Sequence, residues 1–147
     1  MNAMILATLI LLGPTAALAE LAVSGPWARA SVLASRPGAA YLTLESADGD
    51  RLIGLTTPVA EAVTIHAVEQ GDDGTSRMVL LPALDLPAGE RVELAPGGTH
   101  LMLMGLKDKL AEGSRFFLTL EFEAAGPITV EVPVLGIAAT GPGGAGQ

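Results

Sequence analysis

The residues of this chain best suited to chemistry are two histidines and three methionines, His66, Met78, His100, Met102 and Met104. The thioether sulfur of methionine is a soft, neutral ligand and imidazole is a borderline one, so together they suit Cu(I). Zinc prefers thiolate, imidazole or carboxylate ligands, and calcium and magnesium prefer oxygen. The chain contains no cysteine, which excludes a thiolate metal site and any disulfide framework. Methionine supplies a sulfur ligand that does not form disulfides outside the cytoplasm.

The segment THLMLMGL, 99–106, predicts how some of these donors are presented. Side chains two positions apart in a strand share a face and lie roughly 6.6–6.8 Å apart along it. His100 and Met102 are therefore expected to converge on one ion, while the leucines between them pack the opposite face. Met104 shares the ligand face, but a methionine in a strand is usually core filler. The sequence leaves the role of Met104 open.

His66 and Met78 lie in two predicted strands joined by the turn Gly71-Asp72-Asp73-Gly74. Pairing His66 directly with Met78 requires a hairpin loop of odd length, for example residues 70–74. An even loop centred on the two aspartates would place Met78 opposite Ala67, on the wrong face. A metal site at these residues therefore predicts an odd loop. The alternative interpretation of His66 is a half-buried histidine that is satisfied by hydrogen bonds.

Short strands separated by turn signals dominate the sequence after the leader. Most of these segments alternate apolar and polar residues or are rich in β-branched and aromatic residues. Strands at this spacing, without long helical patterns between them, predict an all-β sandwich or barrel. KDKLAEG, 107–113, has room for one helical turn at most. The predicted strands are 39–46, 51–57, 62–69, 76–81, 91–95, 99–106, 114–124 and 127–136.

The chain divides into an N-terminal leader, 1–19, one β-sandwich domain, 20–136, and a Gly-rich tail, 137–147, which is expected to be flexible. The leader is apolar and ends in Ala17-Leu18-Ala19, an A-x-A pattern typical of a cleaved secretory signal peptide. It has no Lys or Arg before its apolar run, so an uncleaved membrane anchor is the alternative. The run is short for a membrane span and is broken by Gly13-Pro14.

The charge balance is acidic, with eight Lys and Arg against sixteen Asp and Glu and a net charge of −8. Such a surface repels nucleic acid, so no nucleic-acid partner is expected. It favours solubility and attracts cations or basic partners.

The spacing of four donors forms a recognisable signature. His66 is followed by eleven residues and Met78, and Met78 by twenty-one residues and His100-Leu101-Met102. This spacing resembles H(M)-X10-M-X21-H-X-M, the signature of periplasmic copper chaperones of the PCuAC type. All four ligand positions match, and the optional methionine after the first histidine is Ala67 here. Similarity extends over about 22–136 and includes Trp27-Ala28-Arg29, Ala39-Ala40-Tyr41-Leu42, 96–103 and 118–122.

This resemblance implies a cupredoxin-like Greek-key β-sandwich that binds one Cu(I) through His66, Met78, His100 and Met102. It implies a monomeric chaperone in the periplasm that carries copper toward the binuclear copper site of cytochrome c oxidase. The partner would be a copper-accepting periplasmic protein or an oxidase subunit, and the chaperone would meet the membrane only through that partner. Some relatives carry a His- and Met-rich C-terminal extension that binds further copper. The tail here lacks such donors, so a second copper site is not expected.

Other classes of function remain as alternatives. A copper enzyme needs an open coordination position and usually several imidazoles, and two histidines suit it poorly, so no enzymatic activity is expected. A blue-copper electron carrier needs a cysteine. A protein for copper tolerance or storage would use the same ligands. A metal-free, exported binding module on a β-sandwich predicts that His66 and His100 lie far apart.

Overall fold

The alternation of the sequence becomes a series of strands in the computed structural model, which describes residues 20–142. No residue in that range is helical, and so no helix there is long and apolar enough to cross a membrane. The ten strands are β1 (Leu21–Arg29), β2 (Gly38–Ser46), β3 (Asp50–Thr56), β4 (Ala60–Gln70), β5 (Ser76–Leu81), β6 (Leu84–Leu86), β7 (Arg91–Glu93), β8 (His100–Leu106), β9 (Arg115–Phe122) and β10 (Gly126–Leu135).

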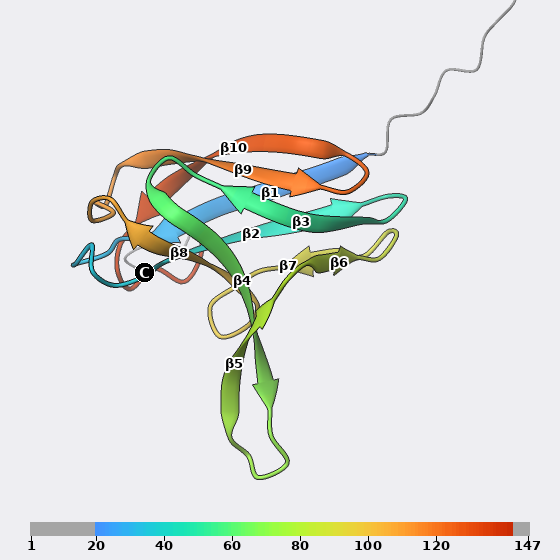
Figure 1. Ribbon diagram of the computed structural model, residues 1–147, viewed down its shortest axis with the longest axis horizontal. Coiled ribbons are helices and arrows are strands. Elements are labelled where there is room, and N and C mark those ends of the chain that lie inside the picture. Colours follow the sequence, from blue (N-terminus) through green and yellow to red (C-terminus); the bar gives the residue numbers. More distant parts are fainter. Residues whose placement is uncertain (1–19, 143–147) are drawn as a thin grey trace, which may run out of the picture.

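The strands hydrogen-bond in the order β5-β4-β8-β2-β1-β10-β9-β3-β6, and β7 pairs with β2. One layer holds β5, β4, β8, β2 and β1, and the other holds β10, β9, β3 and β6 (Figure 1). The layers are joined where β1 and β10 pair in parallel, at Ala28 with Val134 and Arg29 with Leu135. Neighbours in this order are often far apart in the chain, as expected for a Greek key.

The core lies between the two layers and is filled by one face of each main strand. Its burial from water is the main source of stability for a chain without disulfides. Because Leu101 and Leu103 of β8 face this core, the side chains of His100, Met102 and Met104 lie on the outer face of their layer. The buried core includes Leu42, Leu44, Leu101, Leu103, Phe116, Leu118, Leu120, Phe122, Val132 and Val134. The prediction of a single all-β, cupredoxin-like Greek-key sandwich is confirmed.

All eight strands predicted from the sequence form, with small differences at their ends. The prediction missed β1 and the short β6. The segment 107–113 contains turns and no helix, and Leu110 anchors it in the core. The backbone N–H of Leu110 donates to the Ser31 hydroxyl at 2.7 Å.

The first residues after β10 pack onto the domain. Ala139 is buried against Trp27 and Tyr41, whose ring centroids lie 4.5 Å apart. The Arg29 Nε–H donates to the Ala139 carbonyl at 2.8 Å. The packed chain therefore continues beyond residue 136, which had been expected to end the domain. The signal-peptide segment, 1–19, and the last part of the expected tail, 143–147, lie outside the described residues.

The β4–β5 hairpin projects from the sandwich (Figure 1). The pairing of β4 with β8 ends at His66 and His100. Beyond that pair, β4 bonds only to β5, through Val68 with Met78 and Gln70 with Ser76. An isolated two-stranded hairpin is only marginally stable by itself, so this projecting part is expected to be more mobile than the sheet.

Candidate metal centre

His66 and His100 are directly opposite each other in the antiparallel pair of β4 and β8. Their ring centroids lie 5.8 Å apart, and the ring planes are tilted by 35°. Both side chains are partly buried on the outer face of the first layer. The metal-free interpretation predicted that the two histidines lie far apart, and this distance contradicts that prediction.

The hydrogen bonds of the two rings leave nitrogen atoms available. His100 Nδ1 lies 2.8 Å from the Gly98 carbonyl, which only accepts, so Nδ1 carries the proton and the lone pair of Nε2 is free. Such a bond orients many metal-binding histidines. His66 Nδ1 is buried and has no hydrogen-bond partner among the described residues. A buried ring nitrogen that no protein group satisfies is suited to bind an ion.

Met102 lies beside this histidine pair on the same face. It follows His100 by two positions on β8, and it pairs with Thr64 on one side and Ala39 on the other. One imidazole from β4 and an imidazole and a thioether from β8 therefore occupy two adjacent rows of one sheet surface. The long, unbranched side chain of Met102 can turn toward the rings without any movement of the backbone.

Met78 lies on the same face, but not at the position the sequence predicted. The hairpin loop spans Gly71 to Thr75, five residues, so the prediction of an odd loop is confirmed. The predicted pairing with His66 is wrong, because Met78 pairs with Val68 and His66 pairs with Leu80. Met78 is thus a diagonal neighbour of His66, at a typical distance of roughly 7–8 Å between such positions.

The shift of one pair originates in the loop. Asp73 accepts hydrogen bonds from the Thr75 hydroxyl at 2.6 Å and the Thr75 N–H at 3.1 Å. The Gly71 N–H donates to the Thr75 carbonyl at 2.7 Å and closes the loop one residue later than predicted. The hydrogen bond from the Thr75 hydroxyl lowers the pKa of Asp73 most, and the bond from the Thr75 N–H lowers it further. The carboxylate that accepts these bonds therefore stays ionised.

The surface around the four predicted ligands carries no charged side chain along β4, β5 and β8. The nearby ion pair of Glu69 and Arg77, at 3.1 Å, lies on the other face of the hairpin. Within residues 20–142, no three His, Cys, Asp or Glu side chains gather into a group that could hold a metal ion, so any ion here would depend on the methionines as well. Neutral imidazole and thioether groups in a neutral surrounding favour Cu(I) over zinc or calcium. The outer-face residues are Ala62, Thr64, His66, Val68, Met78, Leu80, His100, Met102 and Met104.

Leu80 and Thr64 are among the residues of this surface that were not singled out from the sequence. Leu80 is the direct neighbour of His66 and is 61% exposed. The Thr64 hydroxyl, opposite Met102, is buried without a partner among the described residues. Only the register of the strands reveals either position, because neither residue type signals metal binding.

Solved structures share this arrangement of strands. The structure of the "apo PmoF2 PCuAC domain" matches with a TM-score of 0.69 and 27% identity, over 85% of this chain and 97% of that domain. The "Copper-bound PCuAC domain from PmoF2" matches with a TM-score of 0.66 and 28% identity, over 80% and 94%. The solution structure of "CuI-DR1885" from Deinococcus radiodurans matches with a TM-score of 0.60 and 31% identity, over 75% and 74%. The fold is therefore that of a PCuAC domain.

The sequence comparison identifies the family. Residues 21–134 match the family described as "Putative lipoprotein LpqE-like", and the chain belongs to that family. A relative from Leifsonia xyli subsp. xyli, "Putative lipoprotein Lxx21020", is 34% identical over 83 residues. That match covers 56% of this chain and 50% of the relative. The chain thus aligns with about half the length of this curated relative.

Proposed function

We propose that this protein is an exported copper chaperone that holds one Cu(I) ion with His66, Met78, His100 and Met102. The observation that carries the proposal is the pair of opposed imidazoles, 5.8 Å apart, beside a thioether on the same uncharged surface. The His100 Nδ1 bond to Gly98 and the unsatisfied Nδ1 of His66 fit this use of the rings. Similarity to a copper-bound PCuAC domain supports copper as the ion.

The chemistry of the site would be ligand exchange and not catalysis. His100 and Met102 are held firmly, because the leucines that alternate with them are buried in the core. Met78 is 59% exposed on the projecting hairpin, so it is the ligand that an incoming donor would replace first. The ion would remain Cu(I), and each new copper–sulfur bond would replace an old one.

The partner we propose is an exported protein that accepts copper from this chain. The copper would then be used to assemble the copper site of cytochrome c oxidase. Export is supported by the apolar leader and by the lipoprotein names of the family and of its relative. Storage or tolerance would use the same donors. The exposure of Met78 favours transfer over storage. A storage protein is expected to enclose its copper ion, whereas a chaperone must leave a ligand accessible so that the ion can pass to the partner.

An anaerobic Cu(I) titration of the purified protein, in competition with a chromophoric chelator, tests this proposal. The native protein is expected to bind one equivalent tightly. His100→Ala and Met102→Ala are each expected to weaken binding by at least about tenfold, or about 1.4 kcal/mol. Phe117→Leu is the control, because Phe117 is exposed on β9 in the other layer. No binding by the native protein, or equal binding by all variants, would contradict a copper function.

A further inference from the structure

Met104 is a further soft donor on the ligand face. It follows Met102 by two positions on β8 and pairs with Ala62 of β4. It is 37% exposed, whereas its neighbour Leu103 is completely buried. Met104 therefore does not fill the core, which was the alternative interpretation of a methionine in this strand.

The register places Met78 and Met104 on opposite sides of the histidine pair. Successive cross-strand pairs on this face form rows along the strands. Met78 lies one row from His66 toward the hairpin loop, and Met104 lies two rows from His66 in the other direction, next to Met102. Three rows separate the two methionines, about 20 Å along the strands at the usual rise. One ion therefore cannot bind Met78 and Met104 together. Along β8, Met104 and His100 are equally far from Met102, each two positions away from it.

The surroundings leave the Met104 thioether accessible. Its cross-strand neighbour is Ala62, which is small and exposed, so no bulky side chain covers it from β4. The same face carries no charged group in the rows from Ala62 to Val68. The three rotatable bonds of methionine allow the sulfur of Met104 to swing toward that of Met102.

We propose that Met104 is an auxiliary Cu(I) ligand that holds the ion together with Met102 when Met78 has released it. This inference rests on the proposed copper function. In the exchange, the bond from copper to Met78 sulfur breaks and a bond to Met104 sulfur forms. No electron or proton moves, and the ion stays Cu(I). Copper thereby shifts along β8, away from the β4–β5 hairpin. It remains bound to the protein after Met78 has released it.

The test combines Met78→Leu, Met104→Leu and the double variant in Cu(I) competition titrations. Leucine removes the sulfur and nearly preserves volume, and both sites are exposed, so folding is preserved. Met104→Leu alone is expected to stay within about twofold of native affinity, and Met78→Leu to lose about tenfold or less. The double variant is expected to lose at least about tenfold more than Met78→Leu, a clear coupling in a double-mutant cycle. In Met78→Leu, the ¹³C resonance of the Met104 methyl group is expected to shift when Cu(I) is added.

The outcomes separate this inference from the copper function. If the native protein binds Cu(I), but the double variant binds no more weakly than Met78→Leu and the Met104 methyl resonance does not move, Met104 is not a ligand. The chaperone proposal then stands without it. If the native protein binds no Cu(I), both proposals fail. Phe117→Leu again serves as the control for an exposed apolar substitution far from the site.

Discussion

His66 and His100 face each other across β4 and β8, yet within residues 20–142 only the Nδ1 of His100 has a hydrogen-bond partner. A buried polar atom without a hydrogen-bond partner lowers the stability of the protein. Such an atom can nevertheless be kept in a site where it binds an ion. His66→Leu is therefore expected to leave the free energy of unfolding of the copper-free protein unchanged or about 1 kcal/mol higher. It is expected to weaken Cu(I) binding by at least about tenfold. Urea unfolding and competition titration measure the two effects.

His100→Leu is the matched comparison for that substitution. It removes the hydrogen bond to the Gly98 carbonyl as well as the ligand. The copper-free protein is expected to lose about 1 kcal/mol of stability, unlike His66→Leu. If His66→Leu destabilised the copper-free protein by as much as His100→Leu, the His66 ring would be satisfied and not poised for a metal.

The length of the β4–β5 loop controls which face Met78 occupies. Deleting Asp72 shortens the segment from Gly71 to Thr75 by one residue; if the loop keeps its five-residue form, it takes Ser76 from β5, and this one-residue slip reverses the face of every β5 side chain relative to β4. Cu(I) affinity is expected to fall to that of Met78→Leu. Asp72→Ala, which keeps the loop length, is expected to bind copper as the native protein does. Cross-strand NMR contacts report the register, and equal affinities for the native protein and a deletion variant whose register has slipped would show that Met78 does not contribute to binding.

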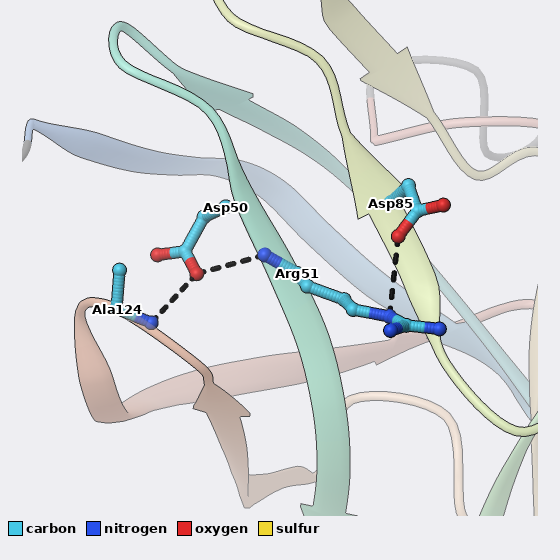
Figure 2. Close-up of polar contacts among 4 residues, drawn as sticks. All are labelled: Asp50, Arg51, Asp85 and Ala124. Carbon is cyan, nitrogen blue, oxygen red and sulfur yellow. Dashed lines mark hydrogen bonds and ion pairs between the residues drawn. The ribbon is translucent and has the colours of Figure 1, made fainter.

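Asp50 ties the turn between β2 and β3 to the turn between β9 and β10. Its carboxylate accepts from the N–H groups of Arg51 at 2.7 Å, Ala124 at 2.8 Å and Ala125 at 3.0 Å; Figure 2 shows the first two bonds. Burial raises the pKa of Asp50, but these bonds outweigh it and hold the pKa below the ordinary 3.8. Asp50→Asn is expected to cost about 1–2 kcal/mol at pH 7, measured by urea unfolding.

The pH dependence of that loss follows from the lowered pKa. A carboxyl group with a lowered pKa stabilises the folded state fully above its unfolded pKa and loses that effect as the pH falls through its folded pKa. The difference between native protein and Asp50→Asn should therefore shrink below about pH 4. Arg51→Ala breaks only the exposed ion pair with Asp85, at 3.2 Å (Figure 2), and is expected to cost under about 1 kcal/mol. A loss for Asp50→Asn that did not vary with pH would contradict this role for the carboxylate.

Gly105 follows Met104 and has a φ of 64°, in the left-handed region. A Cβ atom there would lie 2.6 Å from Glu61 Oε2. Gly105→Ala is expected to destabilise the protein by roughly 1–2 kcal/mol through the backbone alone, with the contact to Glu61 added. Combining it with Glu61→Ala is expected to recover only the contribution of that contact. Thermal unfolding of the three variants measures this, and full recovery in the double variant would show that the φ angle carries no cost.

The fold was predictable where burial enforces alternation. Every second residue is buried throughout β9 and in β8 as far as Leu103, and one buried face fixes both the strand and its orientation. β1 was missed because Gly25 and Pro26 look like a break. Its register with β2 shifts between Ser24 and Trp27, and a bulge of this kind tolerates proline within a strand.

The spacing signature named the four candidate ligands, but the strand pattern alone placed them relative to one another only within a single strand. The shared face of His100 and Met102 follows from a period of two. The pairing of His66 with His100 joins distant parts of the chain, and the register of Met78 depends on how Asp73 and Thr75 close their loop. Burial of Ala139 depends on the Trp27 and Tyr41 rings beneath it. Local sequence patterns do not contain these long-range relationships.

X-ray absorption spectroscopy of the protein loaded with one equivalent of Cu(I) identifies the atoms bound to copper and so tests the proposed ligands themselves. We expect a Cu(I) edge and a coordination shell of two nitrogen and two sulfur atoms. Met102→Leu should lose one sulfur, and His100→Ala should lose one nitrogen. A shell of nitrogen and oxygen alone, or a sulfur count unchanged in Met102→Leu, would contradict the assignment of these residues as the copper site.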